Sequence, residues 1–162
     1  MATAGKNLSN YDPSDLPEGA RFKVGIAVSE WNRQYTEGML NGALEVLKEA
    51  GVENILVKWV PGSYELPLAS QMMLESRSNE LDAVIAIGSV IRGETAHFDY
   101  VCSATAQGIM DVNLKTGKPV AFCVLTDNTE EQAEARSGGK HGNKGTEAAV
   151  VILKMLALRS EL

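Results

Sequence analysis

A short polar loop after a long apolar run holds the residues of this chain best suited to acid–base chemistry on an anion. The run, Leu81–Ile91, predicts a buried strand, and a helical pattern begins near His97 after the loop 92–95. Backbone N–H groups at the start of that helix lack intrahelical partners and favour negative charge, and an imidazole titrates near neutral pH. The pattern indicates proton transfer on a bound anion, although a histidine in such a loop is about equally often structural.

Two other predicted strand ends carry candidate ligand-binding residues. Glu65 follows the turn 61–64 at the start of a predicted helix, where a carboxylate more often caps the helix than binds a ligand. Trp31 follows the first predicted strand, and a stacking platform for a flat heterocycle explains it as well as a surface-covering aromatic does. Both residues stay candidates for contact with a polar, aromatic ligand.

The segment 136–145 gathers cations among glycines. Such a composition usually forms a solvated loop, and the spacing of a Walker phosphate loop is absent because no Gly-Lys-Ser/Thr follows the glycines. Arg136 is the best anion ligand of the segment, since a planar guanidinium matches the geometry of phosphate. We expect His141, in the same loop, to be a bystander.

The composition limits the classes to which this chain can belong. Its 162 residues with 44% apolar content suffice for one core, and no linker-like stretch divides them. The formal charge of −6 argues against a nucleic-acid partner, which needs a basic face. We expect a soluble, cytoplasmic protein, because neither a signal peptide nor an apolar run of bilayer length is apparent. Cys102 and Cys123 lie in apolar segments without a metal-binding pattern, so we expect both to be reduced and buried, with no metal site.

Hydrophobic periodicity predicts alternating strands and helices. The expected strands are 22–29, 54–60, 81–91 and 120–126. The expected helices are 33–50, 66–78, 97–115, a short piece at 129–136, and a final helix at 146–159 that follows a glycine-rich loop. Because strands that alternate with helices pair in parallel through right-handed crossovers, the sequence predicts a three-layer α/β/α sandwich. Its parallel sheet has four strands, with a possible additional strand near the N-terminus.

This arrangement gathers the candidate residues on one edge of the sheet. In doubly wound sheets ligands bind beyond the carboxyl ends of the strands. Trp31, Glu65, the loop 92–97 and residues 126–128 each follow one of the four predicted strands. We therefore expect a single site along that edge.

The first twenty residues differ in character from the rest of the chain. They contain prolines, glycines and polar residues with little periodicity, so we expect residues 1–20 to form a tail or arm that orders only against a partner. Residues 21–162 are expected to form a single α/β domain.

Three common functions of doubly wound sheets lack their signatures here. No Gly-x-Gly-x-x-Gly follows the first predicted strand, so a Rossmann dinucleotide site is unsupported. The acidic pair that a phospho-receiver domain needs at that place is missing, and no Gly-x-Ser-x-Gly nucleophile elbow occurs. A flavin or nucleotide binder stays open, but it would need a phosphate loop after the first strand that this sequence lacks.

Four segments in order resemble the lumazine synthase family. They are VPGSYELP (60–67), GSVIRGETAHFDYV (88–101), PVAFCVLT (119–126) and QAEARSGGKHGNKG (132–145). Each segment is moderately specific, and the ordered set at compatible spacing is highly specific. The resemblance extends from about residue 22 to the C-terminus and leaves the first twenty residues outside.

The resemblance implies a flavodoxin-like fold and a transferase of riboflavin biosynthesis. The family condenses 5-amino-6-(D-ribitylamino)uracil with 3,4-dihydroxy-2-butanone 4-phosphate to 6,7-dimethyl-8-ribityllumazine, releasing phosphate and water without metal or organic cofactor. Family members form pentamers, and in some organisms twelve pentamers form an icosahedral capsid. The resemblance therefore implies a homo-oligomer whose active sites lie between subunits.

The resemblance also implies a role for each matched residue. Trp31 takes the position of an aromatic that stacks on the pyrimidine, and His97 matches the proton-transfer residue. Arg136 matches the phosphate ligand, which the adjacent subunit supplies together with Phe122. Lys144 matches a family lysine of the same region. The other matched substrate-binding residues are Ser63, Tyr64, Glu65, Ser89, Val90, Ile91, Glu94, Thr95 and Lys140.

A shell or scaffold protein that uses this fold without catalysis is the alternative from another class. The presence of His97 and Arg136 argues against it, because a shell has no need of a proton-transfer residue or a phosphate ligand. Incubation with both substrates, followed by lumazine fluorescence, separates the two functions.

Overall fold

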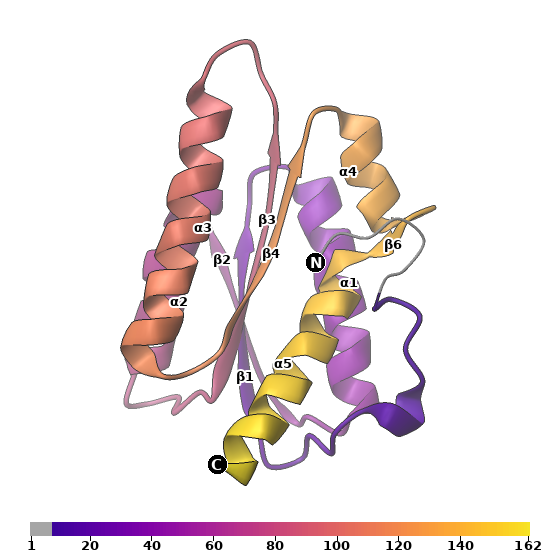
Figure 1. Cartoon of the computed structure of the whole chain (residues 1–162), viewed down its shortest axis with the longest axis vertical. Coiled ribbons are helices and arrows are strands. Elements are labelled where there is room, and N and C mark those ends of the chain that lie inside the picture. Colours follow the sequence, from indigo (N-terminus) through magenta and orange to yellow (C-terminus); the bar gives the residue numbers. More distant parts are fainter. Residues whose placement is uncertain (1–7) are drawn as a thin grey trace.

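The computed structural model describes residues 8–162, which form a four-stranded parallel sheet between two layers of helices (Figure 1). The strands are β1 (Lys23–Ser29), β2 (Asn54–Val60), β3 (Ala83–Ile91) and β4 (Val120–Asp127), in the order β2-β1-β3-β4. The main helices are α1 (Arg33–Glu49), α2 (Leu66–Glu75), α3 (His97–Thr116), α4 (Glu130–Arg136) and α5 (Lys144–Glu161). Short 3-10 turns at Pro13–Asp15 and Ser63–Glu65, and a hairpin of β5 (Ser137–Gly139) and β6 (Gly142–Asn143), complete the elements of this part. The predicted α/β/α sandwich with a parallel sheet is confirmed.

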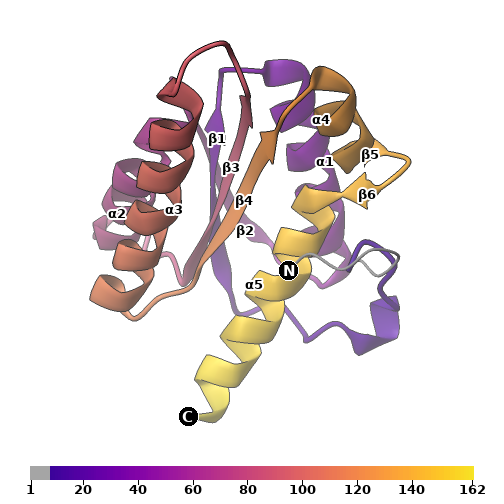
Figure 2. The same cartoon turned by 45° about the horizontal axis from the view of Figure 1, so that its top comes forward.

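The helices divide between the two faces of the sheet (Figure 2). α1 and α5 pack together on one face, with α4 on the same side, whereas α2 and α3 pack together on the other face. This division follows from the connections, because each right-handed crossover places its helix on a face set by the direction of strand order. Within residues 8–162, no helix is long and apolar enough to cross a membrane.

Alternating strand residues build one apolar cluster on each face. Ile26, Ile85 and Ile87 belong to the larger cluster beneath α1 and α5, and Ala27 and Ala86 belong to the smaller one beneath α2 and α3. Successive side chains of a strand point to opposite faces, which explains why an unbroken apolar run suits a strand buried on both sides. The sheet is therefore a rigid support for the loops at its edge.

Element boundaries that differ from the predicted ones have local causes. α2 ends at Glu75, earlier than expected, because Ser76 takes an extended conformation with φ −68° and ψ 116°. α5 begins earlier than expected, at Lys144, because the Asn143 side chain accepts hydrogen bonds from two N–H groups of the first turn, at 2.8 and 3.4 Å. The expected glycine-rich loop contains the β5–β6 hairpin.

Residues 8–22, which include much of the predicted tail, pack against their own chain. Tyr11 and Leu16 lie against the larger apolar cluster, and the Tyr11 hydroxyl donates a hydrogen bond to Glu49 of α1. The expectation of an arm that orders only against a partner is therefore wrong for this segment, because its apolar side chains bury on the chain itself. These residues contain no strand, so they do not supply the possible additional one. Residues 1–7 of the predicted tail lie outside the described residues.

The two cysteines are both free but differ in environment. Cys123 is buried with its Sγ 3.8 Å from Met39 Sδ, and burial raises the pKa of its thiol to about 12. Cys102, in α3, is only half-buried, so the expectation of burial is wrong for that residue. Within residues 8–162, no group of three His, Cys, Asp or Glu side chains is placed to hold a metal ion.

Candidate active site

Most of the predicted site residues meet in one pocket at the carboxyl ends of β1, β2 and β3. The pocket has a volume of about 680 Å³, within the usual range for small-molecule sites. The predicted residues that line it are Trp31, Ser63, Tyr64, Glu65, Ser89, Val90, Ile91, Thr95 and His97. Segments far apart in the sequence therefore form one site at the edge where a doubly wound sheet binds its ligands.

Trp31 is presented by a turn that is fastened to two strands. Asn32 has a left-handed backbone conformation, with φ 59° and ψ 43°, and its side chain donates to the carbonyl of Ser89 on β3 at 2.9 Å. The Thr36 hydroxyl donates to the carbonyl of Ser29 at 2.8 Å, which holds the first turn of α1 to the end of β1. The indole is 72% exposed at the rim of the pocket. This placement favours stacking on a flat ring, because an aromatic that only covers the core would be buried.

Two serines of the pocket have buried hydroxyls without a hydrogen-bond partner among residues 8–162. They are Ser63 and Ser89, which are 5% and 1% exposed. The backbone of Ser63 is fixed, since Thr105 donates to its carbonyl at 3.1 Å. Gly88 lets the turn approach β3 this closely, because a Cβ there would lie 2.4 Å from the Ser63 hydroxyl. An unpaired buried hydroxyl costs about 1–3 kcal/mol, so its place in a pocket indicates a ligand that can pair with it.

Glu65 is the N-cap residue of α2 and directly follows Ser63 and Tyr64 in the 3-10 turn. Its side chain makes no capping hydrogen bond to α2 and is exposed at the pocket. A capping hydrogen bond is therefore absent, and the favourable charge of a carboxylate at a helix N-terminus is what remains of the helix-cap explanation. The carboxylate is placed to accept hydrogen bonds from a ligand.

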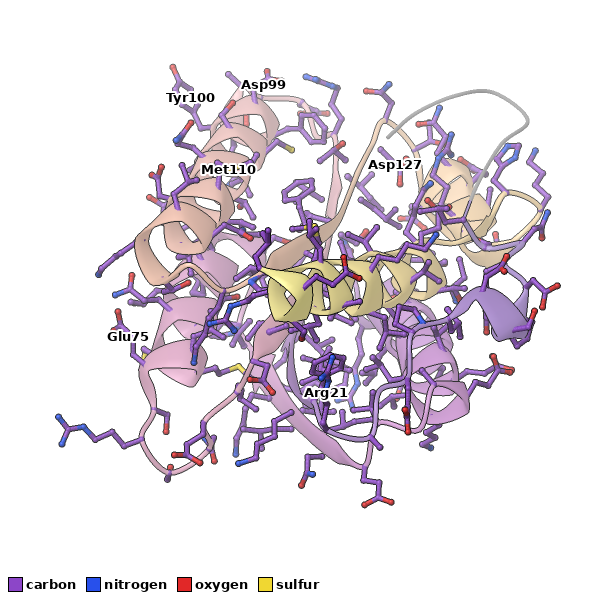
Figure 3. All side chains as sticks on the ribbon, turned by 60° about the horizontal axis from the view of Figure 1, so that its bottom comes forward. Arg21, Glu75, Asp99, Tyr100, Met110 and Asp127 are labelled. Atoms are coloured by element: carbon purple, nitrogen blue, oxygen red, sulfur yellow. The ribbon has the colours of Figure 1, made fainter. Side chains whose placement is uncertain are left out.

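Arg92 fixes the loop that leads to His97. Its guanidinium donates to both carboxylate oxygens of Asp99, at 2.8 and 3.3 Å, and its Nε donates to Asn128 at 3.0 Å. The guanidinium carbon lies 4.1 Å from the centroid of the Phe98 ring, a cation–π distance. Asp99 lies in the first turn of α3, at the outer end of that helix (Figure 3). These contacts hold the start of α3, so the exposed imidazole of His97 faces the pocket from a fixed helix terminus.

Some pocket residues were not among the predicted site residues. They are Gly62, Gly93, Phe98, Tyr100 and Val101. The helical period offered a signal for the last two, because positions three and four residues after His97 lie on the same face of a helix. Tyr100 is 75% exposed and extends the aromatic rim that Trp31 begins.

The other predicted site residues do not line this pocket. Phe122 is 44% exposed on the edge strand β4. Lys140 is exposed at the β5–β6 hairpin, and Glu94 is exposed in the loop before α3. Arg136 is the last residue of α4. Phe122 therefore lies apart from the pocket, and Arg136 and Lys140, at the end of α4 and in the hairpin that packs against it, form a separate cation group.

Arg136 differs from Lys144, the first residue of α5, in how far an acidic neighbour neutralises its charge. Arg136 Nη1 donates to the carbonyl of Gln132 at 2.9 Å and lies 3.8 Å from Oδ1 of Asp127, and the Arg136 side chain is 35% exposed. Burial raises the pKa of the Asp127 carboxyl, and the Arg136 charge opposes that rise. Lys144, in contrast, donates to both carboxylate oxygens of Glu147 at 2.8 Å. Arg136 is therefore better placed than Lys144 to meet an anion.

Several known proteins similar to this chain carry the same description. Residues 21–160 match the sequence model of the family described as 6,7-dimethyl-8-ribityllumazine synthase. A protein of that description from Christiangramia forsetii is 55% identical, with 99% of this chain and 96% of the relative covered. One from Porphyromonas gingivalis is 54% identical with 98% of both chains covered, and one from Flavobacterium johnsoniae is 52% identical with 99% and 85% covered. These matches include every segment that builds the pocket and the Arg136 group.

Proposed function

The chain belongs to the 6,7-dimethyl-8-ribityllumazine synthase family, and we propose that the pocket described above is where it binds its pyrimidine substrate. The enzyme condenses 5-amino-6-(D-ribitylamino)uracil with 3,4-dihydroxy-2-butanone 4-phosphate in riboflavin biosynthesis, and it releases phosphate and water. The observation that carries the proposal is the convergence of Trp31, Ser63 and His97, from three different strand ends, in one pocket. The indole of Trp31 suits a flat ring, the hydroxyl of Ser63 suits a chain that bears hydroxyl groups, and the imidazole of His97 suits a proton transfer.

The pyrimidine and its ribityl chain are assigned to the part of the pocket lined by Trp31, Ser63 and Glu65. Trp31 stacks on the ring, since its indole is exposed at the rim. Glu65 accepts hydrogen bonds from ribityl hydroxyls, and the buried hydroxyl of Ser63 is a further partner. The end of β3, residues 89–91, offers backbone groups to the edge of the ring. These contacts give an orientation to a substrate that has many hydroxyl groups.

His97 is proposed to move protons during the condensation. The amine of the pyrimidine attacks the ketone to give a carbinolamine and then an imine, after which phosphate is eliminated and the second amine closes the ring. An imidazole exchanges protons readily near neutral pH and can serve several of these steps. Much of the acceleration is expected from holding two reactants together, because effective molarities of oriented reactants are large.

The phosphate is assigned to Arg136 of an adjacent subunit, with Phe122 beside the ring. Neither residue lines the pocket of its own chain, although both are open to a neighbour. Exposed Lys140 adds positive charge near Arg136, and backbone N–H groups of residues 94 and 95 lie before the N-terminus of α3. A complete site then needs the pocket of one subunit and the cations of the next.

We propose a closed ring of subunits, because each complete site needs residues of two neighbours. The resemblance to the family implies at least five subunits. The outer surface of α2 and α3 exposes Leu68, Met72, Met110 and Leu114, with exposed fractions between 54% and 77%. Met110 and Tyr100 are both on α3, in the helix layer opposite α5 (Figure 3). In the opposite helix layer, α5 exposes Met155 and Leu158. Two different apolar surfaces on one chain favour heterologous contacts that close into a ring.

The residues 107–114 of α3 are proposed to face the axis of that ring. Ile109 and Val112 are buried against the sheet, but Met110 and Leu114 are exposed, so the apolar stripe of this helix is more than ordinary core. A mass measurement distinguishes a single pentamer from a capsid of twelve pentamers. The cytoplasmic location of the enzyme stays a prediction.

Incubation with both substrates tests the function directly. We expect lumazine fluorescence to appear together with an equal amount of inorganic phosphate. A protein that forms particles but releases neither product would be a shell of the same fold. A chain that binds flavin or nucleotide but makes no lumazine would belong to the other class of binder.

A further inference from the structure

Asp127 is a buried carboxylate beside the arginine that we assign to phosphate binding. It is the last residue of β4, aligned with Ile91 of β3 in the sheet, and it is only 7% exposed. Its Oδ1 lies 3.8 Å from Arg136 Nη1, and its Oδ2 has no hydrogen-bond partner among residues 8–162. A carboxylate buried with a single distant cation weakens the fold, because lost hydration is poorly compensated. Stability therefore does not explain this residue.

The guanidinium of Arg136 is engaged on one side only. Nη1 donates to the carbonyl of Gln132 at 2.9 Å and faces Asp127. Within residues 8–162, Nε and Nη2 have no acceptor. These two N–H groups form the edge with which a guanidinium binds two phosphate oxygens in parallel. Asp127 thus lies behind the guanidinium, and the edge suited to phosphate is open.

We propose that Asp127 sets the affinity of Arg136 for phosphate, by holding the guanidinium in place and by offsetting part of its charge. The inference rests on the proposed function, because it takes Arg136 as the phosphate ligand. A carboxylate behind the arginine repels a phosphate bound in front of it, and this repulsion is screened less in a partly buried site than at an exposed surface. The phosphorylated substrate still binds through its other contacts. Inorganic phosphate has no other contacts with the reacting substrate, so it leaves readily after the elimination.

Asp127→Asn isolates the charge, because asparagine keeps the size and an acceptor oxygen. We expect the KM for 3,4-dihydroxy-2-butanone 4-phosphate and the inhibition constant of inorganic phosphate both to fall about three- to tenfold. The dissociation constant of inorganic phosphate, measured by calorimetry on the resting enzyme, should fall by a similar factor. kcat should not rise, since phosphate leaves more slowly. A purely structural residue would give a higher KM and a lower unfolding temperature.

Glu134→Gln is the matched control. It removes the same charge from α4, but its carboxylate is exposed and screened by solvent, so phosphate binding should change less than about twofold. Asp127→Asn should change phosphate binding much less in an Arg136→Ala background, because a phosphate that the guanidinium no longer holds is not kept close to the carboxylate. If Asp127→Asn folds poorly, Asp127→Ser serves as a second neutral replacement. It should also lower the dissociation constant of inorganic phosphate.

The outcomes distinguish the inference from its premise. Unchanged or weaker phosphate binding in both neutral variants, together with a strong defect in Arg136→Ala, overturns the role of Asp127 and leaves the proposed function intact. Wild-type phosphate binding in Arg136→Ala overturns the phosphate assignment and the inference with it. A wild-type enzyme that forms no lumazine overturns the proposed function.

Discussion

The pocket around Trp31, Ser63 and His97 and the cation group around Arg136 lie at the same edge of the sheet but are built in different ways. The pocket combines exposed aromatics with buried hydroxyls that have no partner in residues 8–162. The cation group combines a partly open guanidinium with a buried carboxylate. The first is suited to recognise a ligand by shape and by hydrogen bonds to uncharged groups of the substrate, and the second by the charge of a phosphate. Changes in the two regions should therefore affect different substrates.

The largest effect is expected from separating the subunits, because that removes one region from the other. Met110→Asp combined with Leu114→Asp places charges on the exposed apolar surface of α3, where the two side chains are 54% and 77% exposed. We expect dissociated protomers that keep their fold and lose activity. Light scattering with the fluorescence assay gives the measurement, and Glu37→Lys, on the exposed surface of α1, is the control. An active monomer would refute a site shared between subunits.

Arg136→Ala should give the next largest loss, confined to the phosphorylated substrate. A guanidinium–phosphate pair in a partly dry site contributes about 2–3 kcal/mol, so kcat/KM for the butanone phosphate should fall roughly 30- to 150-fold. Binding of the pyrimidine should change little. Lys144→Ala is the matched control, since Glu147 already neutralises that ammonium. Kinetic constants equal to those of the wild type would remove Arg136 from the site.

His97→Ala should lower kcat by about 10- to 100-fold, with similar affinity for both substrates. The loss is partial because the pocket still brings the reactants together without the imidazole. The rate should also lose any dependence on pH that reflects an imidazole between pH 5 and 8. If the variant matches the wild type throughout that interval, His97 has only a structural role at the start of α3.

Local sequence patterns were sufficient to predict that the residues of the pocket meet at one edge of the sheet. Apolar runs predict the strands, and parallel pairing brings Trp31, Glu65 and His97 to one edge whatever the details of packing. The ends of helices were harder to predict, because Ser76 ends α2 through its backbone conformation and Asn143 starts α5 through its side chain. The sequence contains these residues but does not show which conformation they take.

Contacts between distant segments could not be predicted in the same way. Asp127 stands between polar neighbours, a pattern typical of a loop, and it is buried at the end of β4 beside Arg136 of α4. Tyr11 occurs in a segment without periodicity, yet it packs against the core next to α1. In both cases burial depends on a partner distant in the sequence, so local composition gives no sign of it.

Ser63→Ala should separate binding from stability within the pocket. Loss of a hydrogen bond to the ligand should raise the KM for the pyrimidine about three- to tenfold. The unfolding temperature should stay the same or rise, because a buried hydroxyl without a partner in residues 8–162 is removed. Ser70→Ala is the matched control, since that hydroxyl is equally buried and unpaired in α2 but does not line the pocket. Equal KM values in the two variants would show that the Ser63 hydroxyl does not meet the substrate.

The smallest effect is expected from Tyr11→Phe, which lies outside both regions and should change stability but not kinetics. Burial, followed by the hydrogen bond to Glu49, raises the pKa of Tyr11 from about 10 to about 12. The folded state therefore keeps the Tyr11 proton at pH values above 10, where the unfolded state loses it. The contribution of Tyr11 to the free energy of unfolding is therefore complete below pH 10 and disappears as the pH rises toward 12. Below pH 10 the free energy of unfolding of the variant should be about 0.5–1.5 kcal/mol lower than that of the wild type. Denaturant unfolding of both proteins at pH 8 and pH 11 measures this difference, and a difference that grows with pH would show that Tyr11 is not the protonated partner of Glu49.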